Sequence, residues 1–178
     1  MKTLFYGAVL LIAFLGYRSA SAANTPKIGE QSPSFNLPDA KGEMVSLASF
    51  KDKWVVLYFY PKDDTPACTA EACSFRDDLN KIEKLGAKVV GVSVDSGSSH
   101  TEFAKKYKLP FPLLSDREGL VASQYGALTN LFFVKIAKRY TFLISPDGVL
   151  QKMYLSVDTS RHSQQIIDDL KTIQQQKL

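Results

Sequence analysis

The chain has 178 residues, of which 45% are hydrophobic and 22% charged, and its formal net charge is +4. Its length is that of one ordinary domain, which is long enough to bury a sizeable core. Lysines and arginines are scattered among aspartates and glutamates, so no basic block indicates binding to nucleic acid.

Residues 1–22 have the three parts of a secretory signal peptide. A single Lys2 precedes the uncharged stretch Thr3–Tyr17, and the small residues Ala20–Ala22 fit a cleavage site. We therefore expect cleavage after Ala22, export to the periplasm, and a mature domain of residues 23–178 without stable membrane association. An uncleaved anchor is the alternative, although the apolar core is shorter than the roughly 20 residues of a membrane span.

The mature part begins with an arm and a predicted strand–helix–strand unit. Residues 23–41 are rich in Pro, Ser and Asn and predict an irregular arm with short extended pieces. The apolar runs Trp54–Tyr60 and Ala87–Asp95 predict two strands, the first buried on both faces. Between them one helical stripe is predicted, formed by Cys68, Ala72, Phe75, Leu79 and Ile82. This order predicts a right-handed crossover between parallel strands.

The second half of the chain predicts two more helices, a short strand and a hairpin. Ser99 and Glu102 form a capping box that predicts a helix start within DSGSSHTEFAKKY, and FPLLSD predicts a short strand. RYTFLI and VLQKMYL flank the turn signal Ser145–Gly148 and predict an antiparallel hairpin. The amphipathic stretch after Thr159 predicts a closing helix. Together these elements predict an open α/β sandwich.

The only two cysteines, Cys68 and Cys73, lie in PKDDTPACTAEAC, directly after the first buried strand. Thr65 is typical of a helix N-cap and Pro66 of the first helical position. Cys68 then lies in the first turn, where free backbone N–H groups and the helix dipole stabilise a thiolate, the nucleophilic form of cysteine. A buried structural cysteine or, in an oxidising compartment, a structural disulfide is the alternative.

The segment YFYPKDDTPACTAEACSFRD resembles the active-site segment of the peroxiredoxins, whose signature Pro-x-x-x-Thr-x-x-Cys is filled by Pro61, Thr65 and Cys68. The second cysteine, Cys73, is similar to that of the bacterioferritin comigratory protein, or peroxiredoxin Q, branch. SHTEFAKKYKLPFPLLSD and AKRYTFLISPDG also resemble this branch, so the resemblance covers nearly all of the mature chain. It implies a thioredoxin-like α/β fold, with a central mixed β-sheet flanked by helices.

The resemblance also implies a role for each residue of the motif. Cys68 would be the peroxidatic nucleophile, which hydrogen peroxide or an organic hydroperoxide oxidises to a sulfenic acid. Cys73 would resolve that acid as an intramolecular disulfide, and a thioredoxin-like dithiol would reduce the disulfide. Thr65 would hydrogen-bond the peroxide, Pro61 would shield the site, and Arg139 would supply an always-charged fork of donors. We expect a monomer.

The spacing of the two cysteines predicts a conformational switch. On an ideal helix, Cα atoms five residues apart are separated by roughly 8.6 Å and their side chains point about 140° apart. A disulfide needs Cα atoms within about 7 Å, so Cys68 and Cys73 cannot bond while the helix is intact. We expect the first turns to unwind on oxidation and Cys73 to swing inward. Equal protection of the backbone amides from exchange in both redox forms would instead favour a structural disulfide.

Several residues of this region have simpler interpretations. Thr65 caps the helix whether or not it binds peroxide, and without the resemblance Arg139 would be a solvated charge at a strand end. Tyr58 is better explained by packing than by catalysis. Glu71 is equally well explained as a partner of the helix dipole. Arg76 is explained by pairing with a neighbouring aspartate.

Two other classes of function are alternatives for an exported thioredoxin-like chain. Copper-delivery proteins use Cys-x-x-x-Cys with a distant His, and disulfide exchangers typically use Cys-x-x-Cys. This chain has Cys-x-x-x-x-Cys together with Thr65. His100 and His162 are too far apart in sequence for the close ligand pairs of zinc sites. We therefore expect a peroxidase without a metal or other cofactor.

The stretch Ala127–Lys138 departs from the expected family pattern because it is unusually apolar for a surface loop. Leu131, Phe132, Phe133 and Val134 follow one another without a polar residue. Three interpretations stay open: a lid over the site, a patch that docks a partner, or a surface that leans on a membrane.

Overall fold

The computed structural model describes residues 25–131 and 134–176. The predicted signal peptide, residues 1–22, lies outside these ranges. Within them, no helix combines the length and the apolar character that crossing a membrane requires.

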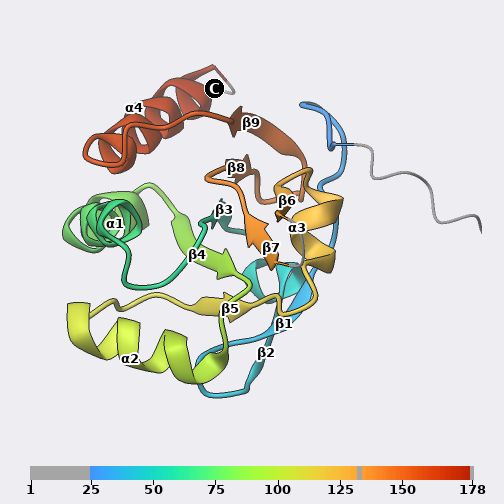
Figure 1. Ribbon diagram of the computed structural model, residues 1–178. Coiled ribbons are helices and arrows are strands. Elements are labelled where there is room, and N and C mark those ends of the chain that lie inside the picture. Colours follow the sequence, from blue (N-terminus) through green and yellow to red (C-terminus); the bar gives the residue numbers. More distant parts are fainter. Residues whose placement is uncertain (1–24, 132–133, 177–178) are drawn as a thin grey trace, which may run out of the picture.

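A mixed sheet of five strands forms the centre of the molecule, in the order β5-β4-β3-β8-β9 (Figure 1). The central strand β3 (Trp54–Phe59) pairs in parallel with β4 (Ala87–Ser93) and antiparallel with β8 (Thr141–Ile144). At the edges, β5 (Leu113–Ser115) lies parallel to β4, and β9 (Leu150–Tyr154) forms an antiparallel hairpin with β8. The predicted strand–helix–strand unit, short strand and hairpin are therefore confirmed.

Helices cover both faces of this sheet. On one face lie α1 (Pro66–Lys84), α2 (Gly97–Tyr107) and α4 (His162–Gln175), and α3 (Leu120–Gln124) lies on the other (Figure 1). Both cysteines lie on the single continuous helix α1, as the sequence predicts.

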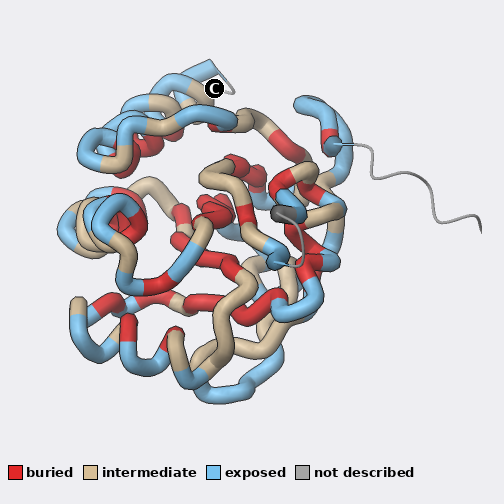
Figure 2. Tube along the Cα trace, in the orientation of Figure 1, coloured by how far each residue is buried: buried red, intermediate tan, exposed pale blue. Residues whose placement is uncertain are grey.

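Two hydrophobic cores lie on opposite faces of the sheet, because successive side chains of β3 point to opposite sides. All six residues of β3 are buried, which explains its continuous apolar run. The first core lies under α1, α2 and α4 and includes Trp54, Val56, Tyr58, Phe75, Phe103 and Ile166. The second includes Val55, Leu57, Phe59, Val121, Tyr125 and Phe142. Figure 2 shows this buried interior, with the exposed residues around its rim.

The remaining elements are short, and of these the sequence pattern predicted only a short extended piece in the arm, where β1 lies. They are β1 (Asn36–Pro38), which pairs with β2 (Met44–Ser46), the 3-10 helix η1 (Leu47–Phe50), and the ribbon of β6 (Leu128–Leu131) and β7 (Val134–Ala137).

The stretch 127–138 is not the surface loop that the sequence suggested. It forms the antiparallel pair β6–β7, and its two ends pack inward, since Ala127 and Ala137 are both buried. Part of its apolar character is therefore core packing. Phe132 and Phe133 lie outside the described residues, so the three interpretations offered for the stretch stay predictions.

The predicted cap of α2 is wrong. The helix begins three residues earlier than the capping box implied, with Ser96 as N-cap, and the Ser96 hydroxyl accepts a hydrogen bond from the Ser99 N–H at 3.2 Å. The side chain of Ser99 is engaged elsewhere, because its hydroxyl donates to Asp63 Oδ2 at 2.7 Å. The hydrogen bond from Ser99 to Asp63 thus takes the place of the local capping bond predicted for the Ser99 side chain.

We predict that Gly91→Ala destabilises the fold, because Gly91 in β4 lies directly beneath a packed tyrosine. An added methyl group would lie 2.8 Å from both Tyr58 Oη and Leu113 Cδ2. Urea denaturation should show a loss of about 1–3 kcal/mol of unfolding free energy. Gly97→Ala is the matched control, since its methyl group would meet the Asp39 carbonyl oxygen at an ordinary 3.4 Å. Equal stabilities of the two variants would contradict this packing.

Candidate active site

Cys68 lies in the first turn of α1, where the helix start packs against the carboxyl end of β3. Only 1% of the residue is exposed, and it belongs to the first core together with Tyr58 and Phe75. Its sulfur accepts a hydrogen bond from Arg139 Nη2 at 3.3 Å. The structure thus brings together two predicted site residues that are 71 positions apart in sequence.

The sheet topology explains why Arg139 reaches Cys68. Strands β3 and β8 are antiparallel, with Tyr58 opposite Thr141, and the Phe59 N–H donates to the Tyr140 carbonyl at 2.7 Å. The entrance to β8 therefore lies beside the exit of β3, which is also where the loop to α1 begins. Because α1 begins at that end of the sheet, Arg139, which lies two residues before β8, faces its first turns.

Glu71 completes the arrangement, although the sequence pattern indicated no clear role for it. Its side chain is fully buried, and its Oε2 lies 2.5 Å from Arg139 Nη1. Burial raises the pKa of Glu71 from 4.5 to about 7, against the opposing attraction of Arg139. The guanidinium of Arg139 is therefore shared between a sulfur and a carboxyl group. The one available signal was spacing: Glu71 follows Cys68 by three residues on the same side of the helix.

His162, in the first turn of α4, lies behind this pair. Its Nε2 is 2.9 Å from Thr141 Oγ1 and 4.0 Å from Glu71 Oε1. Burial lowers the pKa of His162 to about 4, so the imidazole is neutral at neutral pH. Its ring also packs against Phe75 and Tyr154, with centroids 5.3 Å apart in both cases.

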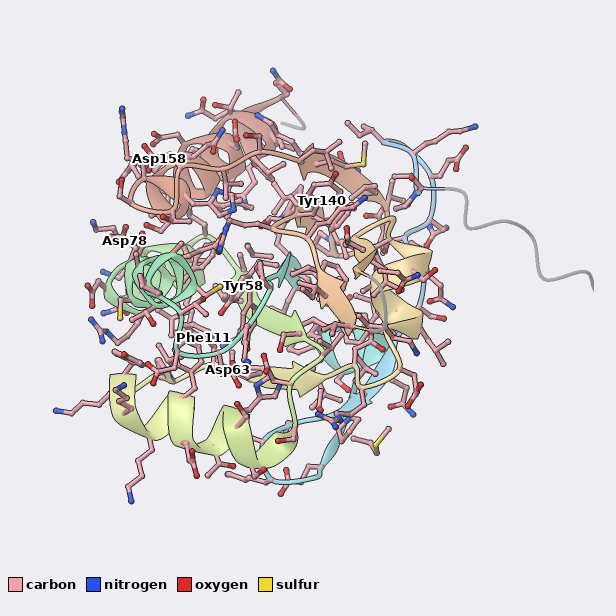
Figure 3. The ribbon with its side chains drawn as sticks, viewed as in Figure 1. Tyr58, Asp63, Asp78, Phe111, Tyr140 and Asp158 are labelled. Atoms are coloured by element: carbon pink, nitrogen blue, oxygen red, sulfur yellow. The ribbon has the colours of Figure 1, made fainter. Side chains whose placement is uncertain are left out.

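The two aspartates of the loop before α1 turn away from Cys68 and toward α2. Asp63 is buried, and it accepts hydrogen bonds from Tyr60 Oη and Ser99 Oγ, both at 2.7 Å. His100 Nδ1 lies 2.8 Å from the same carboxylate. Burial opposes ionisation, yet hydrogen bonds from these neighbours outweigh it and lower the pKa of Asp63. Figure 3 shows Asp63 between α1 and α2.

Asp64 is exposed and pairs with α2 through Lys106 Nζ at 2.7 Å and Tyr107 Oη at 2.5 Å. The negative charges of the loop therefore have their own partners, which leaves Arg139 to the sulfur and Glu71. His100, a candidate metal ligand from the sequence, contacts the Asp63 carboxylate instead. Among the described residues, no cluster of His, Cys, Asp and Glu is suited to a metal ion.

Thr65 occupies the N-cap position of α1, as predicted, and Pro66 the first helical position. The cap hydrogen bond itself was wrongly predicted, because the Thr65 hydroxyl donates to the Lys62 carbonyl at 3.0 Å. Pro61 follows β3 in the same loop and is half-buried. The roles of Thr65 and Pro61 toward a peroxide stay predictions.

Cys73 lies on a different side of α1 from Cys68, and neither cysteine is in a disulfide. It is half-buried and lines a groove between α1 and the start of α4, with Ser163 and Gln164 opposite. Arg76 pairs with Asp77 at 2.8 Å, as its simpler interpretation predicted. Tyr58 packs as expected, its ring stacked on that of Tyr60 at 5.4 Å.

Comparison with known proteins gives consistent matches. The AhpC/TSA family model matches residues 28–153. The peroxiredoxin bcp of Coxiella burnetii is 45% identical over 148 residues, which are 81% of this chain and 98% of that protein. The chloroplastic peroxiredoxin Q of Sedum lineare is 50% identical over 126 residues, covering 71% of this chain and 67% of that protein.

Solved structures agree with this picture. The crystal structure of peroxidoxin BcpB from Mycobacterium tuberculosis matches with a TM-score of 0.79 and 34% identity, over 83% of this chain and 98% of that one. The bacterioferritin comigratory protein of Xanthomonas campestris matches with a TM-score of 0.73 and 33% identity, over 78% and 90%. The predicted thioredoxin-like fold is confirmed.

We predict that Glu71→Gln changes the pH dependence of stability. A carboxyl group whose pKa rises from 4.5 to about 7 on folding holds its proton more tightly in the folded state. Wild-type stability should therefore fall, relative to the variant, as the pH rises from 4.5 to 7, by roughly 2–4 kcal/mol. Urea denaturation of both proteins across this range measures the difference. A difference that is constant with pH would contradict the assignment.

Proposed function

The chain belongs to the AhpC/TSA family, in the peroxiredoxin branch of the bacterioferritin comigratory protein and peroxiredoxin Q, and from this premise we propose a two-cysteine mechanism. Members of this branch are thiol peroxidases. In our proposal Cys68 reduces hydrogen peroxide and organic hydroperoxides, and Cys73 resolves the product as an intramolecular disulfide. The Xanthomonas campestris relative supports the organic substrates, since its structure was reported for its alkyl peroxide reduction activity.

The contact between Arg139 and Cys68 carries the proposal. The Cys68 thiolate attacks one peroxide oxygen, the O–O bond breaks, and the sulfur becomes a sulfenic acid. The second oxygen leaves with the electron pair of that bond and takes a proton from solvent. Negative charge thus moves from sulfur to oxygen beside Arg139, whose fixed donors stabilise it throughout. Thr65, at the entrance of the helix, supplies a hydroxyl toward the peroxide.

The second step joins the two cysteines. The Cys73 thiol attacks the Cys68 sulfenic sulfur, the S–S bond forms, and the sulfenic oxygen leaves as water. Because α1 is continuous from Pro66 to Lys84, its first turns must unwind before the two sulfur atoms meet.

A dithiol protein of the thioredoxin type then restores the enzyme. Cys73 is the more exposed cysteine and lies at the groove between α1 and α4, so it is the sulfur that a partner protein reaches. The partner thiolate attacks Cys73, and Cys68 leaves as a thiolate that returns to Arg139 when α1 refolds. The second thiol of the partner then attacks the mixed disulfide, so that Cys73 is released and the partner leaves with its own disulfide. We further propose that the protein works as a monomer in the periplasm after cleavage behind Ala22. N-terminal sequencing of the periplasmic fraction should begin at Ala23.

We predict that Arg139→Ala slows sulfenic acid formation at least about a hundredfold, because one charge-stabilising donor is lost from the reacting atoms. Stopped-flow measurement with hydrogen peroxide follows this step directly. Arg76→Ala is the matched control, since Arg76 pairs with Asp77 and the Tyr107 carbonyl rather than with Cys68. Cys68→Ser should abolish turnover. Near wild-type rates in Arg139→Ala, or residual turnover in Cys68→Ser, would refute the proposed chemistry.

We predict that Cys73→Ser forms the sulfenic acid at the wild-type rate but cannot resolve it. Without the second thiol, excess peroxide oxidises Cys68 further to the sulfinic acid. Intact-mass spectrometry after graded peroxide additions should show one added oxygen and then two. Full thiol-dependent cycling of this variant, with no sulfinic product, would mean that Cys73 is not the resolving residue.

A further inference from the structure

Helix α1 has two parts of very different side-chain size, and the division falls directly after Cys73. The first part, PACTAEAC, consists mainly of small residues. The hydroxyl of Thr69, in this part, is buried without a hydrogen-bond partner among the described residues. The second part inserts Phe75, Leu79 and Ile82 into or against the first core. Since burial of large apolar side chains supplies most local stability, the first part should open at a much lower cost.

The chain before this weak part is fixed to α2. Asp63 accepts from Tyr60 and Ser99 and lies against His100, as described above. Its backbone N–H also donates to Asp95 Oδ2 at 2.9 Å. These contacts hold the loop as far as Asp64 and form an upstream anchor.

Directly after the weak part, the Ser163 side chain hydrogen-bonds α1 to α4, beside the packing of Phe75 against His162. Ser163 is 2% exposed, and its hydroxyl donates to Asp78 Oδ2 at 2.7 Å. The Ser74 hydroxyl lies 2.6 Å from the Ser163 hydroxyl and donates to it, because the Ser163 proton is already engaged with Asp78. In Figure 3, Asp78 lies on α1 near α4. Ser163 thus bonds the residue that follows Cys73 and one placed a turn later, and forms a downstream anchor.

We propose that Ser163 is a positioning residue for disulfide formation. It holds Ser74 and Asp78 in both redox forms and so confines the unwinding of α1 to residues 65–73, between the two anchors. The inference rests on the proposed resolution of the Cys68 sulfenic acid by Cys73.

One consequence concerns which cysteine moves. Cys73 is the last residue before the downstream anchor, so its backbone stays nearly fixed when the helix opens. The Cys68 end of the segment is held by the contacts of Arg139 with Cys68 and Glu71 and by burial in the first core. It lacks the Ser163 anchor, however, and therefore travels outward to Cys73. This direction is the reverse of the inward swing of Cys73 that the spacing alone suggested.

Amide hydrogen exchange of the reduced and disulfide forms tests the proposal. In the wild-type disulfide form, amides of residues 65–73 should lose protection while those of residues 74–82 keep it. In Ser163→Ala, residues 74–78 become a free helix end after oxidation and should exchange roughly tenfold faster than in the wild-type disulfide form. In the reduced variant the same residues lie inside an intact helix and should change much less. Peroxide reactivity of reduced Cys68 should stay at the wild-type rate.

Two variants sharpen the comparison. Ser160→Ala is the matched control, because the Ser160 hydroxyl bonds only to the nearby Asp158 and not to α1. Ser74→Ala removes one of the two hydrogen bonds, leaves the Ser163–Asp78 bond, and should give a smaller change of the same kind if Ser163→Ala folds poorly.

If amide exchange of residues 74–78 is accelerated equally in both redox forms of Ser163→Ala, Ser163 is merely structural and the inference is overturned. So would loss of protection beyond residue 74 in the wild-type disulfide form. If peroxide produces no Cys68–Cys73 disulfide at all, seen as no loss of two hydrogen atoms by mass, the proposed resolution step fails and the inference fails with it. A disulfide with the wrong unwinding boundary overturns the inference alone.

Discussion

The guanidinium of Arg139, held between the Cys68 sulfur and the buried Glu71 carboxyl group, is the contact on which the active site depends. It exists because β8 lies antiparallel to β3, so that Arg139, two residues before β8, faces the helix that follows β3. A charge in this position would be costly without partners on both sides. Glu71 supplies the second partner from one turn further along the helix, and its raised pKa is the physical sign of that burial.

The negative charges beside the site also have partners close by. Asp63 and Asp64 would oppose a thiolate if they faced it, but α2 binds both of them through side chains of its own. The loop is thereby fixed at the point where the helix begins. The helix beyond it combines a weakly packed start, which carries both cysteines, with a strongly packed remainder that carries Phe75. The proposed nucleophile and the proposed opening thus lie in the same two turns.

Sequence periodicity predicted the elements with strong local patterns. Trp54–Tyr60, the stripe through Cys68 and Phe75, and the hairpin around Ser145–Gly148 were all found where expected. Cys68 and Arg139 were identified as candidate site residues from the predicted helix start and from the family resemblance. Glu71 was missed because a carboxylate in the first turns of a helix already has a local explanation. The cap at Ser96 was missed because the Ser99 side chain bonds to Asp63 instead, a tertiary contact that no one-dimensional pattern contains.

The central claim is that one helix holds both reacting sulfur atoms and lets them meet only after peroxide has oxidised Cys68. The most direct test is to add one molar equivalent of hydrogen peroxide to the reduced protein and digest it without reductant for peptide mass analysis. The account predicts monomeric protein in which the single peptide spanning Cys68 and Cys73 has lost two hydrogen atoms. A disulfide between chains, or a peptide in which Cys68 has gained oxygen while Cys73 remains a thiol, would contradict it.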